Sequence, residues 1–366
     1  MGENVNMNLP LVENILAQGD SLRAVIAHQY GAGRQALEHA AQLLRSSKQV
    51  VLSGMGASHN ACIPLSNLLA EQGILAPVIE TAELLYFQRQ MLSPDTTLVL
   101  VSRSGESVEA TKLLTIARER GANVIGVVNT PASTVASQAT QAIYVESRPD
   151  QMASIQTYTG SIAALLLLGA AVAYGLDSGI RGDLERTADA ISRWSSEWLR
   201  FSGSWPGFFA GNTPMYVLGR GPSLASALMG ALLLQEVVKI PAIGMSAAQF
   251  RHGPVEVVNE QFHAIVFGTQ PKTADLDRTL AERLDSIGAH VRSVGPEWPA
   301  SQVVSLSAWP QDIPERCAPL LDIVPMQIAA YETARWRGLA IGELKFATPV
   351  TLSERDFAER QQFAQA

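Results

Sequence analysis

Two short motifs of the same form constrain this chain of 366 residues more than any other feature. Each motif ends an apolar run, opens a stretch with helical spacing and fits the pattern G-x-G-x-S. The first reads Val51-Leu52-Ser53-Gly54-Met55-Gly56-Ala57-Ser58, and the second reads Val217-Leu218-Gly219-Arg220-Gly221-Pro222-Ser223. Two copies of one strand-to-helix turn indicate a duplicated domain.

Short apolar runs typical of buried parallel strands alternate with helical stretches in both halves of the chain. The expected strands are Val50–Leu52, Leu98–Val101, Val124–Val128, Ile143–Val145, Tyr216–Leu218, Ala264–Phe267, Val291–Val294 and Val303–Leu306. The expected helices between them are Ser58–Gln72, Ser107–Arg120, Pro131–Gln138, Leu224–Val238 and Leu276–Ser286. This alternation predicts the α/β class, with two doubly wound, mostly parallel sheets flanked by helices.

The same alternation sets the expected domain boundaries. We expect an N-terminal helical segment at 1–40, a first domain at 41–176, a linker helix and loop at 177–212, and a second domain with a C-terminal tail at 213–366. A chain of this length is long enough for two domains that each bury a core.

Composition excludes several classes of protein. The formal net charge is −7 and no basic stripe occurs, so nucleic acid is not an expected partner. Cys62 and Cys317 have no partners at metal-binding spacing, which argues against a disulfide scaffold or a metal site. The first residues show no signal peptide, so we expect a cytoplasmic protein. The uncharged stretch Ser154–Leu176 begins with polar residues, which favours a buried core helix over a membrane span.

The glycine-rich turn Gly54–Ser58 does not favour a cofactor. His59 stands where the dinucleotide fingerprint G-x-G-x-x-G needs its third glycine, so no cofactor is expected. Ser58 instead falls at a predicted helix N-terminus, where unpaired N–H groups and the helix dipole favour an anion.

The segment Ser102–Ser107, with the sequence Ser-Arg-Ser-Gly-Glu-Ser, follows an apolar strand and precedes a helix. Three hydroxyls, a glycine and an arginine at such a turn predict a phosphate-binding loop. The alternative is a plain helix cap, for which Ser104 or Ser107 alone would be sufficient.

Two ionisable residues in the second half are candidates for acid–base chemistry. Glu236 interrupts the nearly apolar helix Leu228–Val238, where its pKa could rise toward the range that a general base needs. The alternative is a surface ion pair with Lys239. His252 precedes Gly253 and Pro254 in a loop, where a histidine can also be merely solvated.

These motifs together resemble the SIS (sugar isomerase) domain family. Ser102–Ser107 is similar to the family's S-x-S-G-[ED]-[ST] phosphate loop, and Gly54–Ser58 resembles its first loop. Met152-Ala153-Ser154 resembles the segment that closes the sugar site. The stretch from Ala231 to Pro254 is similar to the isomerase domain of glucosamine-6-phosphate synthase. The resemblance extends from about residue 40 to the C-terminus, with no segment like that synthase's glutaminase domain.

The resemblance implies roles for eight residues. It implies sugar-phosphate contacts at Ser58, Ser102, Arg103, Ser104, Ser107 and Ser154. Glu236 falls on the family's general base, and His252 on the histidine that helps to open the sugar ring. In the family, the histidine loop reaches into the neighbouring subunit's site, so the resemblance also implies a homodimer with shared active sites.

The chain departs from the synthase at two lysine positions. Leu233 replaces a lysine three residues before the base, and Thr348 or Pro349 replaces the lysine that forms an imine with the sugar. Lys345 is near in sequence but out of register. We therefore expect an isomerase, deaminase or deglycase of amino-sugar or ketosamine phosphates that works without an imine to a lysine. The alternative is a non-catalytic sugar-phosphate sensor.

Overall fold

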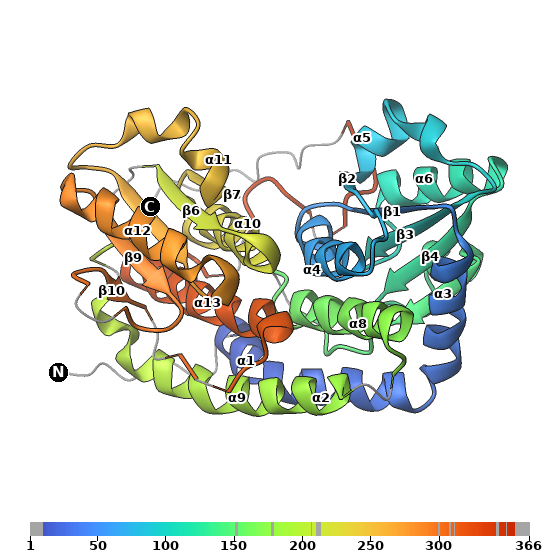
Figure 1. Ribbon diagram of the computed structural model, residues 1–366, viewed down its shortest axis with the longest axis horizontal. Helices are drawn as coiled ribbons and strands as arrows, with labels where there is room; N and C mark the ends of the chain where they lie inside the picture. Colours follow the sequence, from blue (N-terminus) through green and yellow to red (C-terminus); the bar gives the residue numbers. More distant parts are fainter. Residues whose placement is uncertain are drawn as a thin grey trace. The chain divides into compact units, whose positions relative to one another are not determined.

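The computed structural model describes residues 10–150, 153–176, 179–205, 207–209, 214–298, 301–306, 309–310, 312–341, 344–348 and 350–355. The chain divides into two compact units. The β1–β5 unit comprises Ala24–Ser178 and Gly342–Ala366, and the β6–β10 unit comprises Met1–Arg23 and Gly179–Ile341. Figure 1 shows a sheet with flanking helices in each unit.

The β1–β5 unit follows the expected alternation of strands and helices. Its strands are β1 (Gln49–Gly54), β2 (Val78–Glu80), β3 (Thr96–Ser102), β4 (Asn123–Val128) and β5 (Gln141–Tyr144). Its helices are α3 (Arg34–Ser46), α4 (Ala57–Glu71), α5 (Thr81–Tyr86), η1 (Arg89–Met91), α6 (Val108–Glu119), α7 (Thr134–Gln138) and α8 (Gln156–Ala173). Helix α2 (Gln18–Tyr30) spans the boundary between the two units.

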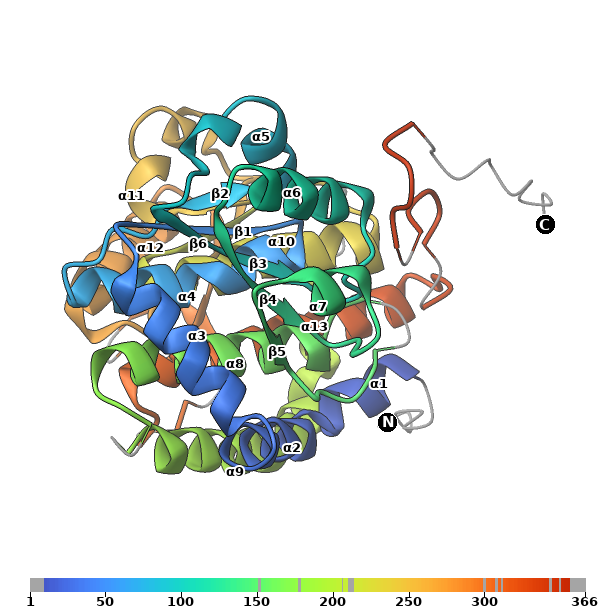
Figure 2. The same cartoon turned by 90° about the vertical axis from the view of Figure 1, so that its right-hand side faces the viewer.

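This sheet is fully parallel in its described strands, with the order β2-β1-β3-β4-β5. Its central strands β1, β3 and β4 are buried on both faces over most of their length, as crossover helices require. Leu98 and Leu100 of β3 belong to a core with residues of α5, α6 and α7. Helices α3, α4 and α8 cover the other face (Figure 2). A Cβ on Gly169 of α8 would lie 2.5 Å from Leu68 Cδ2, so glycine permits the close packing of α8 on α4.

The β6–β10 unit repeats this plan. Its strands are β6 (Met215–Gly219), β7 (Ala242–Ser246), β8 (His263–Phe267), β9 (His290–Val294) and β10 (Val304–Ser305). Its α-helices are α1 (Pro10–Leu16), α9 (Ile180–Phe201), α10 (Leu224–Leu233), α11 (Ala247–Phe250), α12 (Ala274–Ser286) and α13 (Ala318–Trp336). Short helical turns are η2 (Ser202–Ser204), η3 (Gly221–Ser223), η4 (Leu234–Val238), η5 (Pro254–Val257), η6 (Pro271–Thr273) and η7 (Glu315–Cys317).

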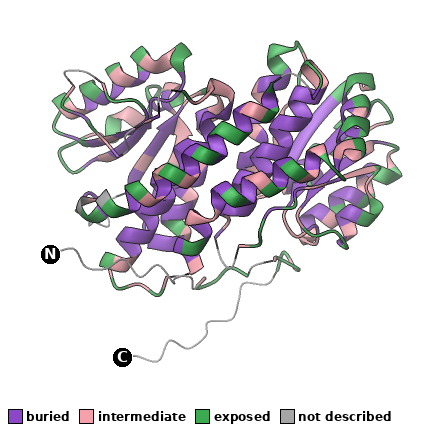
Figure 3. Cartoon of the chain, turned by 90° about the horizontal axis from the view of Figure 1, so that it is seen from below, coloured by how far each residue is buried: buried purple, intermediate pink, exposed green. Residues whose placement is uncertain are grey.

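The second sheet has the same topology as the first. Its described strands are parallel in the order β10-β9-β8-β6-β7, so each sheet follows the 2-1-3-4-5 pattern of strands in chain order. Phe250 and Leu280 lie in the core between one face of the sheet and α11 and α12. Helices α10 and α13 pack together in the same unit. In Figure 3 the strands of both units are drawn mainly in the colour of buried residues. Both expected doubly wound sheets are therefore confirmed.

The units differ from the expected domain ranges in three places. Residues 1–23 of the expected N-terminal segment belong to the β6–β10 unit. The expected linker contains α9, which packs on α13 and has buried residues such as Leu184 and Ile191. The tail from residue 342 belongs to the β1–β5 unit, where the backbone N–H of Val108 donates to the Thr351 carbonyl.

Strands β2 and β7 and helix α13 are among the elements that were not expected from the sequence. Strand β2 has only three residues, and none of them is fully buried. Strand β7 carries Ile243, which is 40% exposed. Helix α13 is buried around its whole circumference, so it lacks the one-sided pattern that marks a surface helix.

Candidate functional site

The centre of the first sheet has the topology that forms a ligand-binding crevice at the carboxyl edge of doubly wound sheets. Strands β1 and β3 are neighbours, but the helix after β1 and the helix after β3 cover opposite faces of the sheet. In doubly wound sheets, ligands bind where neighbouring connections diverge in this way. The two loops at this point are Met55–Gly56, followed by Ser58 in α4, and Ser102–Ser107.

The Ser102–Ser107 loop is folded by its own hydroxyl groups. Ser102 Oγ accepts a hydrogen bond from the N–H of Gly105 at 3.1 Å, and Ser104 Oγ accepts one from the N–H of Glu106 at 3.2 Å. The carbonyl of Arg103 accepts from the backbone N–H of Asn129 at 3.1 Å. Arg103, Ser104 and Ser107 are half-buried, so the loop is ordered yet reaches solvent.

Gly105 and Glu106 fix this loop against α7. Gly105 has φ +65°, and a Cβ there would lie 2.2 Å from Ser133 Oγ. Glu106 Oε1 accepts from the Thr134 N–H at 2.6 Å, and Oε2 accepts from the Thr134 hydroxyl at 2.9 Å. The Glu106 carboxylate is therefore committed to the first turn of α7. The sequence motif that contains Glu106 was expected, but the bond from Glu106 to α7 could not be predicted, because Thr134 is 28 residues away in the sequence.

Ser107 bears directly on whether the loop is only a helix cap. It occupies the N-cap position of α6 with extended backbone, but its side chain makes no capping hydrogen bond. Ser133, at the N-cap of α7, does make one, because its Oγ accepts from the Ala136 N–H at 3.3 Å. The Ser107 hydroxyl is thus positioned at a helix N-terminus without serving as its cap.

The first loop places Ser58 at the second residue of α4. Gly56 has φ +51°, and a Cβ on Gly54 would lie 2.7 Å from the N of His59. These two glycines let the chain turn sharply from β1 into α4. Ser58 is half-buried, and its N–H donates to the Met55 carbonyl at 3.0 Å. The structure therefore brings Ser58 and the Ser102–Ser107 loop to the same edge.

Ser154 lies just before α8, and Met152 of the same motif lies outside the described residues. Asp150 caps this helix, since its carboxylate accepts from the N–H groups of Ile155, Gln156 and Thr157 at 3.0, 2.9 and 2.9 Å. Burial raises the pKa of Asp150, while these hydrogen bonds act in the opposite direction. Because Asp150 already occupies the N–H groups at the start of α8, a ligand would contact the side chain of Ser154 and not the N-terminus of the helix.

A segment of the tail lies along the start of α6. Besides the bond between Val108 and Thr351, Glu354 Oε1 accepts from Lys112 Nζ at 2.6 Å and from the Tyr86 hydroxyl at 2.5 Å. The Lys112 ammonium is the main cause that lowers the pKa of the Glu354 carboxyl. The tail therefore adjoins the helix that follows the Ser102–Ser107 loop.

Glu236 lies in the β6–β10 unit, within the π-helical turn η4 that continues α10. Such turns occur often at functional sites because they displace one residue from the regular helix. Glu236 is half-buried, and Lys239, with φ +61°, ends the turn and donates from Nζ to the Glu236 backbone carbonyl. The break in the helix was not apparent from the sequence.

His252 lies in the same unit, on an exposed loop between α11 and η5. Its N–H donates to the Gln249 carbonyl at 3.0 Å, and the following Gly253 has φ +122°. The residues expected at one site are thus divided between the two units, with the hydroxyl-rich loops in one and Glu236 and His252 in the other.

The sequence model of the SIS domain matches residues 43–171 and 209–296, which is more than half of the chain. The chain belongs to the SIS domain family. A curated relative, the isomerizing glutamine–fructose-6-phosphate aminotransferase of Pyrococcus horikoshii, is 26% identical over 335 residues, covering 90% of this chain and 55% of the relative. The chain spans about half the length of the curated relatives that it matches first.

Solved structures show the same fold at low sequence identity. The C-terminal domain of glucosamine-fructose-6-phosphate aminotransferase from Francisella tularensis has a TM-score of 0.81 and 18% identity, covering 94% of this chain and 100% of that one. Glucosamine-6-phosphate deaminase from Thermotoga maritima has a TM-score of 0.72 and 18% identity, covering 92% of this chain and 97% of that one. These likenesses support tandem SIS domains.

The expected departures at the lysine positions can be placed only in part. Leu233 is fully buried at the end of α10. Thr348 is exposed, and its hydroxyl donates to the Val350 carbonyl at 2.9 Å, while Pro349 lies outside the described residues. Lys345 is exposed and belongs to the β1–β5 unit.

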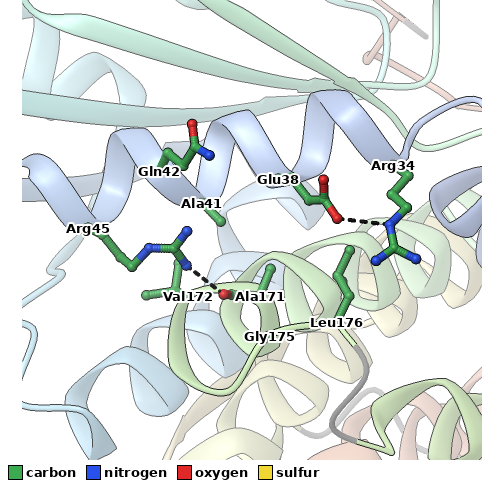
Figure 4. Close-up of a pocket in the computed structure, with 9 residues that line it drawn as sticks. All are labelled: Arg34, Glu38, Ala41, Gln42, Arg45, Ala171, Val172, Gly175 and Leu176. Carbon is green, nitrogen blue, oxygen red and sulfur yellow. Dashed lines mark hydrogen bonds and ion pairs between the residues drawn. The ribbon is translucent and has the colours of Figure 1, made fainter.

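A cavity of about 360 Å³ lies away from the carboxyl edge, between α3 and the end of α8 (Figure 4). Arg45 Nη1 donates to the Ala171 carbonyl at 2.7 Å, and Arg34 Nε pairs with Glu38 at 2.8 Å. Since these guanidinium groups are engaged by the protein and no loop of the crevice reaches the cavity lining, we do not take this cavity as the functional site.

Two other kinds of site find no support among the described residues. They contain no cluster of three or more His, Cys, Asp or Glu side chains able to hold a metal ion. Burial raises the pKa of both Cys62 and Cys317, which disfavours the reactive thiolate.

Two described segments, Gln156–Ala173 and Gly221–Val238, are long and apolar enough to cross a membrane, but 89% and 61% of them are buried inside the protein. Buried core helices of globular proteins meet the same criterion, so these segments are weak grounds for a membrane span.

Proposed function

We propose that this chain is a sugar-phosphate enzyme that transfers a proton between C1 and C2 of an open-chain amino-sugar or ketosamine 6-phosphate. The observation that carries the proposal is the Ser102–Ser107 loop at the crevice of the first sheet, where Ser107 occupies a helix N-cap without capping it. Hydroxyl and backbone N–H donors at a helix N-terminus suit a phosphate dianion.

In this proposal, the first SIS domain holds the substrate. Ser102, Arg103, Ser104 and Ser107 bind the phosphate, and Ser58 and Ser154 contact the sugar. The loop needs little rearrangement to do so, because Gly105 and Glu106 already fix its conformation against α7. A preformed loop loses less conformational entropy when the ligand binds.

The second SIS domain supplies acid–base groups. His252 donates a proton to the ring oxygen as the ring opens. With a 2-amino aldose, Glu236 then removes the proton from C2, which gives an enaminol, and returns it to C1. The product is an imine at C2, which water hydrolyses to a ketose phosphate and ammonia. With a ketosamine, whose C2 is a carbonyl carbon, the proton moves from C1 to C2, and water hydrolyses the resulting imine at C1 to an aldose phosphate and the free amine. We propose a homodimer with shared active sites in the cytoplasm, without a cofactor, a metal or an imine to lysine.

An activity panel tests the reaction. Amino-sugar and ketosamine 6-phosphates are supplied one at a time, and release of ammonia, free amino acid and hexose phosphate is followed, with Glu236→Gln as the control. Turnover of at least one compound, lost in the control, is the expected result. Tight binding of a sugar phosphate without turnover of any compound would favour the sensor alternative.

Two serines at helix N-cap positions provide a matched test of the phosphate loop. Ser107→Ala is expected to weaken sugar-phosphate binding by about 1–2 kcal/mol, because the variant loses one hydrogen bond to a charged group. Its folding stability is expected to change little. Ser133→Ala removes a true cap and is expected to cost about 1 kcal/mol of stability with little change in binding. The reverse outcome, measured by calorimetric titration and thermal melting, would remove the Ser102–Ser107 loop from the site.

A further inference from the structure

The second SIS domain keeps the same strand-to-helix turns at the carboxyl edge of its own sheet. Strands β6 and β8 are neighbours at its centre, as β1 and β3 are in the first sheet. A Cβ on Gly219 would lie 2.6 Å from the Ser223 carbonyl oxygen, the same close approach that Gly54 makes to Ser58 and His59. Gly221 has φ +52°, close to the value of +51° at Gly56. This edge therefore has the backbone of a second anion site.

A carboxylate of α12 already accepts hydrogen bonds from two of the donors at this edge. Arg220 Nε, in the loop after β6, pairs with Asp277 Oδ1 at 2.6 Å. The Thr273 hydroxyl, at the start of α12, donates to Asp277 Oδ2 at 2.8 Å. The side chain of Asp277 is fully buried and that of Arg220 is only 11% exposed. The arginine charge of the loop is thus neutralised from within the chain.

A second carboxylate accepts hydrogen bonds from hydroxyl groups near the loops that follow β6 and β8. Asp322 of α13 is fully buried and accepts from the hydroxyls of Ser226 and Thr269, the latter at 3.0 Å. Ser223 Oγ lies 2.7 Å from Thr269 Oγ1 and accepts from Gln270 Nε2 at 2.7 Å. Burial raises the pKa of Asp322 to about 7, against the effect of these hydroxyls.

Two polar atoms of this network have no hydrogen-bond partner among the described residues. They are Arg220 Nη2 and Gln270 Oε1, both buried. A buried donor without a partner is costly and is satisfied by any acceptor that can reach it. An incoming anion would meet Arg220 there, but it would also lie beside Asp277, whose like charge repels it.

We propose that Asp277 and Asp322 occupy the anion site of the second SIS domain from within the chain, so that inorganic phosphate or a phosphate ester enters this edge only when the Asp277 carboxylate is removed. In the first domain, the hydroxyls of the Ser102–Ser107 loop lie at the carboxyl edge of the sheet. In the second domain, the arginine and the hydroxyls at the corresponding edge are hydrogen-bonded to side chains of the same chain. The inference rests on the proposed function only in taking phosphate as the ligand of the first edge.

Asp277→Asn tests this occupation. The variant keeps an acceptor for Thr273 and removes the charge that neutralises Arg220. Equilibrium dialysis with inorganic phosphate is expected to show a gain of one bound phosphate per chain relative to wild type, and phosphate is expected to raise the melting temperature of the variant more than that of wild type. The matched control is Asp275→Asn, on the same turn of α12, whose side chain is 92% exposed. It is expected to show no gain.

A wild-type chain that binds two phosphates, or a folded Asp277→Asn that gains none, would overturn the inference. If the asparagine variant does not fold, Asp277→Ser gives the same readout. Failure of the proposed function is distinguishable: if the Ser102–Ser107 loop binds no phosphate, the wild-type number falls to zero, while the gain in Asp277→Asn remains one.

Discussion

Replacing Asp322 by asparagine is expected to change how the stability of the β6–β10 unit depends on pH. Asp322 is fully buried, and burial raises the pKa of its carboxyl from 3.8 to about 7. In the unfolded chain the carboxyl titrates near its ordinary value. Between these two pH values the folded protein therefore holds a proton that the unfolded chain has released.

The sign and size of the effect follow from this difference. The contribution of the protonated Asp322 side chain to folding stability is complete below the pKa that this carboxyl has in the unfolded chain. The contribution is lost as the pH rises through the folded-state pKa of about 7. At about 1.4 kcal/mol per pKa unit, the whole interval is worth about 4 kcal/mol, of which about 2 kcal/mol falls between about pH 5.5 and pH 8. Because the side chain is fully buried, solvent does not screen it.

Asparagine matches the shape of the protonated acid and has no proton to lose. Thermal melting of Asp322→Asn and wild type is therefore compared at about pH 5.5 and pH 8. The melting temperature of the variant, relative to wild type, is expected to rise by about 4–8 °C between the two values. Asp275→Asn, on an exposed side chain, is expected to show no such change. A constant difference between Asp322→Asn and wild type at both pH values would refute the reasoning.

Three further predictions concern the proposed active site. Gly105→Ala is expected to cost about 1–3 kcal/mol of stability and to abolish sugar-phosphate binding, because an alanine at this positive φ is strained and its Cβ clashes with Ser133. The control Gly73→Ala, at φ +74° in open space, is expected to leave binding intact. Equal effects of the two variants on binding would contradict the role of the loop. Glu236→Gln is expected to lower turnover by about 10²–10⁴-fold while substrate binding is retained. If the two subunits share active sites, mixing Glu236→Gln subunits with His252→Ala subunits is expected to restore part of the activity. Verified mixed dimers without activity would count against shared active sites. Borohydride with substrate is expected to trap no adduct, because the resemblance to the family puts Thr348 or Pro349 at the imine position, and a sugar adduct on Lys345 found by mass spectrometry would disprove this.

Much of the fold could be predicted because its signals are local. Strands such as β3 are apolar throughout, and the glycines of Gly54–Ser58 and Gly219–Ser223 mark the two central turns. Strand β2 and helix α13 could not be predicted, since one is short and half-buried and the other is buried on every side. Their existence depends on neighbours that are distant in sequence.

The candidate site divides in the same way. The Ser102–Ser107 loop was predicted from adjacent residues, because a strand, hydroxyls and a helix start follow one another along the chain. The bond of Glu106 to Thr134 and that of Val108 to Thr351 join distant segments, so only the structure could place them. The resemblance to a family named Glu236, but the π-helical turn that presents it has no sequence signal that we recognise.

The two sheets share one topology but differ in the side chains at their carboxyl edges. Both have the same strand order and the same close approach of a glycine to the following helix, so the backbone at each edge is equally suited to an anion. Ser107 leaves a hydroxyl at one edge without a capping bond, whereas Arg220 at the other is paired with Asp277. A buried, paired arginine loses its affinity for external anions but holds two loops together. The proposed occupation by Asp277 and Asp322 would mean that one copy of a duplicated domain has exchanged ligand binding for internal order without any change of fold.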